Sequence, residues 1–216
     1  MADDALDSLI DKSLALYTAI GEILSDAGIY DLDRAEACYR LCSLSFEHGS
    51  SVLLLAAHKN NTSSASMVRL QFEALVRGMW VWYAATDLAV SKLLAPLSSE
   101  AIQAAKNLPS INDMLKAIAK SENTPPMAAV MLEDFRQQLL AELNSFVHAG
   151  IFPIKLHELG GTPAVTAKVI KHSNAMMTMA GMMLANLSGD EETMTRMSKI
   201  QPRFTDCLPP LIHPSA

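Results

Sequence analysis

A long amphipathic segment, MAAVMLEDFRQQLLAELNSFVHA, occupies residues 127–149 and gives the clearest evidence of the fold class. Its apolar residues recur every three or four positions, the spacing of an amphipathic helix: Met127, Val130, Met131, Phe135, Leu139, Leu143, Phe146 and Val147. At about 100° per residue, Asn144 and His148 stand one turn apart on the flank of this apolar seam. A polar pair at the edge of a core can reach both a pocket and solvent, so this pair is the first candidate for a functional site.

The same helical spacing continues on both sides of this stretch, and segments with strand-like alternation are nearly absent. Clusters of glycine, asparagine, serine and aspartate mark the ends of the helices. Further long helices are predicted at residues 4–25, 64–85 and 163–187, and another from a cap at Asp31 or Asp33 to about residue 58, with shorter pieces at 86–126 and 190–200. We therefore predict an all-α fold, an antiparallel bundle of four to five long helices with short inserted helices.

The length and composition of the chain fit one domain. Of its 216 residues half are hydrophobic, which is enough for a sizeable core. We predict a single helical domain over residues 1–200. The remainder, QPRFTDCLPPLIHPSA at residues 201–216, is rich in proline, and we expect it to be a loosely attached tail.

The net charge of the chain argues against a protein that binds nucleic acid through its overall charge. The formal net charge is −6 and the isoelectric point is near 5.5, so no overall basic field exists to hold nucleic acid. Any RNA would have to be bound by a local group of residues, and DNA binding is not expected.

Cysteine usage and the N-terminal sequence bear on location. Cys38 and Cys42 stand four apart without a second pair, which favours a reducing compartment over disulfides or zinc. The acidic start MADDALDSL lacks the basic and apolar regions of a secretory signal, and no apolar run reaches the roughly 18 residues of a membrane span. We therefore expect a cytoplasmic protein that neither crosses nor binds a membrane.

Charged residues interrupt the otherwise apolar helix at residues 64–85. Arg69, Glu73 and Arg77 are spaced four apart and form one stripe, in which Glu73 can pair with either arginine. One interpretation is an ion-paired helix face without further function. The other is a cradle for phosphate or carboxylate, because guanidinium groups suit phosphate and a base could stack on Trp80, three residues beyond Arg77. Trp80 has a simpler alternative as a core residue.

Two other features have both a structural and a functional interpretation. Five methionines are concentrated at residues 176–183, where they either fill gaps in a core or form an adaptable docking or dimer surface. His48 lies in the helix predicted at 33–58 and could approach the helix at 127–149. A histidine among apolar residues is, however, more often a hydrogen-bonded core residue.

Several common catalytic motifs are absent from the sequence. There is no glycine-rich phosphate loop after a strand, no His-Glu-x-x-His zinc motif and no Gly-x-Ser-x-Gly nucleophile elbow. The histidines also lack glutamates at the spacing of the Glu-x-x-His pattern of di-iron bundles. We therefore expect neither a metal ion nor a cofactor.

The motif LNSFVHAG at residues 143–150 and the arginine–glutamate helix VRLQFEALVRGMWVWY at residues 68–83 resemble the HEPN superfamily. Its members are helical-bundle proteins of many prokaryotic toxin, antitoxin and phage-defence systems, and the resemblance covers residues 6–187. Active HEPN ribonucleases carry an arginine, often followed by asparagine, and a histidine four to six residues after that arginine. Leu143 occupies the arginine position here, which removes the usual partner of the transition-state charge on phosphate.

The resemblance leads to two hypotheses from different classes. In the first, the chain is a metal-independent endoribonuclease of a toxin or phage-defence type. His148 would be the general base or acid at the ribose 2′-OH, Asn144 would orient the phosphate, and Arg69 or Arg77, oriented by Glu73, would replace the missing arginine. HEPN enzymes usually place this motif at a dimer interface, so RNA and a second copy of the chain are the expected partners.

In the second hypothesis, the chain is a non-catalytic binding module, an antitoxin-like or scaffold protein that acts through protein contacts. Leu143 and the acidic net charge favour this alternative. The candidate pair also has a purely structural interpretation: His148 would bond the last carbonyls of its helix, and Asn144 would bond a neighbouring helix.

Overall fold

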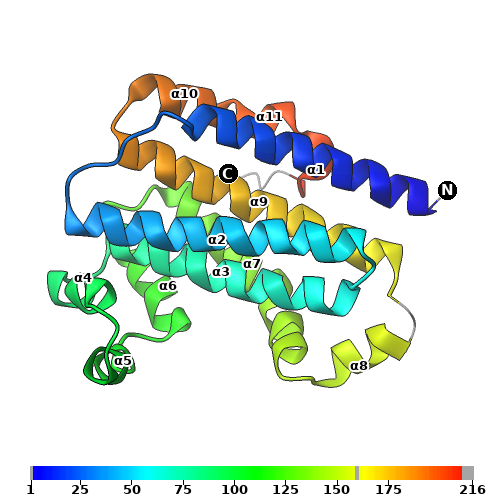
Figure 1. Cartoon of the computed structure of the whole chain (residues 1–216), viewed down its shortest axis with the longest axis horizontal. Coiled ribbons are helices and arrows are strands. Elements are labelled where there is room, and N and C mark those ends of the chain that lie inside the picture. Colours follow the sequence, from blue (N-terminus) through cyan, green and yellow to red (C-terminus); the bar gives the residue numbers. More distant parts are fainter. Residues whose placement is uncertain (1, 159–160, 211–216) are drawn as a thin grey trace.

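The computed structural model of the chain describes residues 2–158 and 161–210, and these residues form helices without any strand (Figure 1). The prediction of an all-α fold is confirmed. The long helices are α1 (Ala2–Leu24), α2 (Asp33–Ala57), α3 (Asn61–Tyr83), α7 (Pro126–Val147) and α9 (Pro163–Ser188). The shorter elements are α4 (Asp87–Leu94), α5 (Ser99–Ala105), α6 (Ile111–Lys120), α8 (Ile151–Glu158), α10 (Glu191–Ser198), α11 (Ile200–Arg203) and the 3-10 helix η1 (Thr205–Cys207).

Local sequence explains where many of the helices begin and end. Five helices follow a residue whose side chain accepts a hydrogen bond from the first turn: Thr86, Ser98, Ser110, Thr162 and Asp190. Both α7 and α9 have proline in the first turn, where no helical N–H bond is lost. Gly189 ends α9 with a φ of 66°, a conformation that glycine adopts without strain.

The centre of the molecule is α9, which contacts α1, α2, α3 and α10. Residues 172–181 of this helix are all buried. Figure 1 shows α2 and α3 side by side, with α1, α10 and α11 along one edge of the molecule and α4, α5 and α8 along the opposite edge. In the described part of the chain, no helix is both long enough and apolar enough to cross a membrane.

The methionines of α9 belong mainly to the core. Met176, Met177, Met179 and Met183 are buried, as the core interpretation predicted, whereas Met182 is half-buried. Flexible thioether side chains suit this position because they fill irregular gaps between several neighbouring helices.

A buried polar network joins α2, α3 and α9. Gln71 Nε2 donates to the backbone carbonyl of Ser173 at 3.1 Å, and Ser173 Oγ donates to Gln71 Oε1 at 2.7 Å. The hydroxyl of Ser45 donates to the carbonyl of Gln71 at 3.2 Å. A buried polar group without a partner costs about 1–3 kcal/mol, so these bonds favour one register of the three helices over others.

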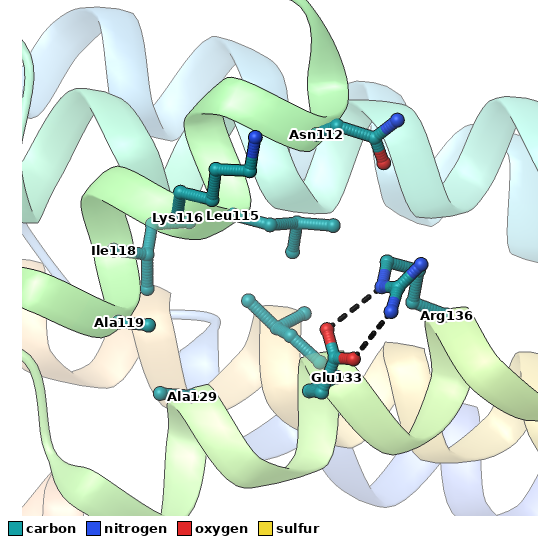
Figure 2. A pocket seen from close by; sticks show the side chains of 9 residues that line it. Asn112, Leu115, Lys116, Ile118, Ala119, Ala129, Glu133 and Arg136 are labelled. Carbon is teal, nitrogen blue, oxygen red and sulfur yellow. Dashed lines mark hydrogen bonds and ion pairs between the residues drawn. The ribbon is translucent and has the colours of Figure 1, made fainter.

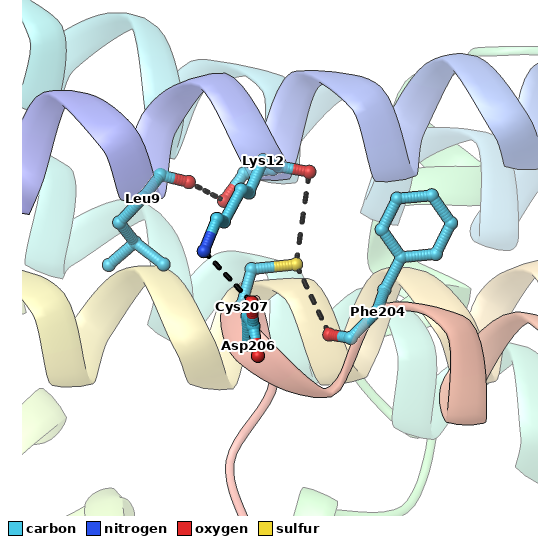
Figure 3. A network of polar contacts seen from close by, with 6 residues as sticks. Leu9, Lys12, Phe204, Asp206 and Cys207 are labelled. Carbon is cyan, nitrogen blue, oxygen red and sulfur yellow. Dashed lines mark hydrogen bonds and ion pairs between the residues drawn. The ribbon is translucent and has the colours of Figure 1, made fainter.

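Residues 201–208, part of the expected loose tail, pack against the rest of the molecule instead. Cys207 and Leu208 are buried, and Asn174 Nδ2 donates to the carbonyl of Cys207 at 2.8 Å. Figure 3 shows η1 held to α1, where Lys12 Nζ lies 2.9 Å from Asp206 Oδ2. The proline content suggested a loose segment, but the buried side chains at 207 and 208 anchor it. Residues 211–216 of the expected tail lie outside the described residues.

Candidate functional site

The charged stripe predicted on α3 is present, and its members interact. Glu73 lies between two arginines: its Oε1 is 2.6 Å from Arg69 Nη1, and its Oε2 is 3.8 Å from Arg77 Nη2. One carboxylate is therefore shared by two guanidinium groups. The three side chains together carry a formal charge of +1, which leaves one positive charge that Glu73 does not balance.

Arg69 connects this stripe to the motif on α7. Its Nε donates a hydrogen bond of 2.9 Å to Asn144 Oδ1, across the interface of α3 and α7. Arg69, Glu73, Arg77 and Asn144, here named the Arg69 cluster, thus form one connected group. Because the amide oxygen of Asn144 accepts from Arg69, its Nδ2 hydrogens remain available as donors.

The Arg69 cluster lies at the boundary between core and solvent. The side chain of Arg69 is only 15% exposed, and this burial lowers its pKa below the ordinary value of arginine, partly opposed by the charge of Glu73. Arg69 Nη1 and Arg77 Nε are buried atoms without a hydrogen-bond partner, since the close approach of Arg69 Nη1 to Glu73 lacks hydrogen-bond direction. These two atoms are not accessible to solvent, so an incoming anion would first meet the exposed parts of Arg77 and Asn144.

His148 immediately follows α7. Its backbone N–H donates to the carbonyl of Asn144 at 3.2 Å, while its side chain is exposed and makes no hydrogen bond within the described residues. Ala149 then turns into the left-handed region with a φ of 50°, and the N–H of Gly150 bonds the carbonyl of Ser145 at 2.8 Å. Backbone groups therefore close the helix, and the imidazole of His148 is not used as a side-chain cap.

Leu143 has a different environment from its neighbour Asn144. It is 4% exposed and lies with Phe72, Phe135, Leu139 and Met176 around a small apolar gap. Successive helical positions differ by about 100°, so residue 143 faces the core and residue 144 faces the surface. Residue 143 is thus a core position of this fold.

Comparison with known proteins gives a family but no function. Residues 42–210 match a family of unknown function, DUF6988. The chain belongs to the DUF6988 family. No curated protein and no solved structure matches the chain. The DUF6988 match includes every residue of the Arg69 cluster and His148, and the resemblance to HEPN proteins stays a prediction.

Trp80, a candidate for stacking on an RNA base, is a core residue in the structure of this DUF6988 protein. Trp80 is 4% exposed and packs in the core, so it offers no free face on which a base could stack. Its neighbour Trp82 is half-buried and stacks on Tyr30, with ring centroids 6.3 Å apart. The alternative interpretation of Trp80 as a core residue therefore holds.

The sequence analysis missed a second polar site of this DUF6988 member, a cavity of about 480 Å³ between α6 and α7 (Figure 2). Arg136 donates from Nε and Nη2 to the two carboxylate oxygens of Glu133 at 2.8 and 2.6 Å, and these bonds lower the pKa of Glu133 to about 2. Lys116 lines the opposite wall. In the sequence, Glu133 and Arg136 stand three residues apart, a spacing typical of an ordinary ion pair on a helix surface, so it does not indicate a cavity.

The described residues offer no cluster of three or more acidic, histidine or cysteine side chains placed to hold a metal ion. His48, the other histidine considered from sequence, is half-buried in α2 and makes no hydrogen bond in the described part of the chain.

Proposed function

We propose that the protein is a metal-independent endoribonuclease of the HEPN type, acting in a toxin or phage-defence system, with its active site at the Arg69 cluster and His148. The observation that carries the proposal is the 2.9 Å hydrogen bond from Arg69 Nε to Asn144 Oδ1. It brings a cation from α3 to the motif on α7, where Leu143 supplies none. Arg69 then takes the part of the arginine that active HEPN enzymes carry in the motif itself.

The proposed reaction is an internal transesterification of RNA. His148 removes the proton of a ribose 2′-OH, and the 2′-oxygen attacks the adjacent phosphorus. The bond from phosphorus to the 5′-oxygen breaks, and this oxygen takes a proton from His148 or from water. The products are a 2′,3′-cyclic phosphate and a free 5′-OH. Arg69 and the Nδ2 hydrogens of Asn144 stabilise the charge that develops on the phosphate oxygens.

The proposal also covers the arrangement of the helices, the oligomeric state and the cellular location of the protein. The five long helices would act as an antiparallel bundle that holds the site rigidly, and the chain would form a homodimer across the motif. A cytoplasmic location is supported by Cys38, Cys42 and Cys207, which are buried free thiols and not disulfides.

Cleavage of total RNA and tRNA by the purified protein in the presence of EDTA tests this function. We expect His148→Ala to lower the rate by about 10²–10⁴-fold and Arg69→Gln by about 10²–10³-fold. His157→Ala is the matched control, because His157 is another exposed histidine, on α8, outside the Arg69 cluster. Cleavage that is equal in the wild-type and His148→Ala proteins would rule the proposal out.

A second candidate is a non-catalytic module that binds another protein, such as an antitoxin-like or scaffold protein. Two observations favour it: Glu73 already pairs with both arginines, and the end of α7 and α8 expose Val147, Ile151, Phe152 and Ile154. Exposed apolar residues in one short stretch are typical of an interaction surface.

The second candidate predicts a dimer in light scattering that Phe152→Asp converts to a monomer, together with no RNA cleavage above that of His148→Ala. Lys155→Asp, a charge change on the same helix α8, should leave the mass unchanged. Robust RNA cleavage that depends on His148 would exclude this alternative in favour of the ribonuclease, whatever the mass of the wild-type protein.

A further inference from the structure

A cleft separates the first half of α7 from the helices that face it. It consists of two cavities, of about 420 and 320 Å³, and Met127, Met131 and Gln201 line both, so the cavities adjoin one another. We name this space the α7–α9 cleft. Its size is in the range of small-molecule sites, roughly 300–1,000 Å³. No residue of the Arg69 cluster lines it, so the inference below does not rest on the proposed ribonuclease function.

One end of the α7–α9 cleft is apolar and adaptable. Seven methionines line the smaller cavity, among them Met79 from α3, Met131 from α7 and Met179 from α9. Thioether side chains are flexible and polarisable, so they can follow the shape of different apolar molecules. This end is suited to a hydrocarbon group without strict shape requirements.

The other end of the cleft carries a short chain of polar groups. Gln138 Nε2 donates to Asp134 Oδ2 at 2.7 Å, and Gln138 Oε1 lies 3.2 Å from His172 Nε2. His172 Nδ1 is 2.8 Å from the carbonyl of Lys168. The Asp134 carboxylate thus has one oxygen bound by Gln138, while Oδ1 has no donor among the described residues.

The charge at this end is negative. Asp134 is the only carboxylate among the residues that line either cavity, and neither cavity is lined by lysine or arginine. His172 is buried, and burial lowers its pKa from 6.5, which favours the neutral ring near neutral pH. Lys168 lies one turn before His172, and its Nζ is 3.8 Å from Glu142 Oε2. Lys171, which directly precedes His172 in the sequence, lowers the pKa of Asp206 and of Cys207 through its charge and does not line either cavity. Phe135 adds an aromatic ring to the wall.

We infer that the α7–α9 cleft binds a monocationic amphiphile, an ammonium group joined to an apolar chain or ring. The ammonium would lie against Asp134 and the ring of Phe135, since a carboxylate and an aromatic face both attract a desolvated cation. The apolar part would lie among the methionines at the other end. An anionic amphiphile of the same length would meet the same methionines but would be repelled by Asp134.

Calorimetric titration of the full chain with two probes of equal chain length tests this inference. The probes are decyltrimethylammonium and decanesulfonate, each kept below its micelle concentration. We expect the cation to bind at least about tenfold more tightly, the effect of one additional ion pair of modest strength. Asp134→Asn should lower the affinity for the cation about tenfold and leave the affinity for the sulfonate equal or higher.

Two further variants separate the site from general surface effects. Glu122→Gln removes an exposed carboxylate outside the cleft and should leave both affinities unchanged. Ala128→Phe fills the methionine-lined cavity and should weaken the binding of both probes. Equal affinity for the two probes, a preference that survives Asp134→Asn, or no binding of either probe would each overturn the inference.

Discussion

At the scale of single residues, Gly49 shows how little space separates α2 from the centre of the molecule. A Cβ at this position would be 2.5 Å from Met177 Sδ and 2.7 Å from Gln71 Nε2, and Gln71 is itself bound to Ser173. Gly49→Ala should therefore displace this polar pair and lower the free energy of unfolding by about 1–3 kcal/mol. Urea denaturation of the purified variant measures the change.

Gly21 in α1 provides the matched control for that substitution. A Cβ there would have no atom within 4 Å, so Gly21→Ala is expected to stabilise the protein by about 0.5–1 kcal/mol through helix propensity alone. If Gly49→Ala and Gly21→Ala change the free energy of unfolding in the same direction, close packing at Gly49 does not determine the effect of its substitution.

At the scale of elements, the end of α7 carries a strained residue. Ala149 has a φ of 50°, and a left-handed conformation costs an L-residue roughly 1–2 kcal/mol. The hydrogen bond from Gly150 to Ser145 holds the turn in this form. Ala149→Gly removes the strain and should raise the free energy of unfolding by about 0.5–1 kcal/mol after the greater unfolded-state entropy of glycine is subtracted.

An Ala→Gly substitution on the exposed face of a helix should instead lower the free energy of unfolding. Ala15 lies in the middle of α1 and is exposed, so Ala15→Gly is expected to cost about 1 kcal/mol. Thermal unfolding of both variants compares them directly. A loss of stability in Ala149→Gly would mean that residue 149 does not adopt the left-handed turn in solution.

The long helices could be predicted from sequence because each has a continuous apolar seam. The bounds 163–187 expected for α9 and the end near residue 58 expected for α2 agree with the structure to within one residue. The expected cap of α2 at Asp31 or Asp33 is absent, because Leu32 precedes the helix and no side chain caps it. The short helix α8 could not be predicted from the sequence pattern, because Gly150 and Pro153 are typical of the end of a helix. Proline is tolerated in the first turn of a helix, and Pro153 lies there in α8.

At the scale of the whole molecule, the site was only partly visible in the sequence. Periodicity places Arg69, Glu73 and Arg77 on one stripe and Asn144 near His148, but it contains no information on how α3 faces α7. The hydrogen bond between Arg69 and Asn144 joins residues 75 positions apart. It depends on the register of two packed helices, which the side chains of the entire core determine together, as does the opening of the α7–α9 cleft.

The stability of the whole molecule should depend on pH, because His172 is buried where α7 and α9 meet. Burial lowers its pKa in the folded protein below 6.5, the value expected in the unfolded chain, although its bond to the Lys168 carbonyl opposes the shift. Below about pH 6.5 the unfolded chain therefore binds more protons than the folded protein. The contribution of His172 to the free energy of unfolding should be constant above that pH. It should fall as the pH drops through the pKa of His172 in the folded protein.

Urea midpoints of wild type and His172→Gln, measured between about pH 7.5 and pH 5, test this linkage. The wild type should lose more stability toward pH 5 than His172→Gln, which has no imidazole to protonate at this position. His157→Gln should keep the wild-type slope, because His157 is exposed on α8. Equal slopes in the wild-type and His172→Gln proteins would contradict a lowered pKa at His172. A steeper slope in His172→Gln would mean that the folded state favours the charged ring, so that His172 and not only Asp134 would carry a charge in the α7–α9 cleft.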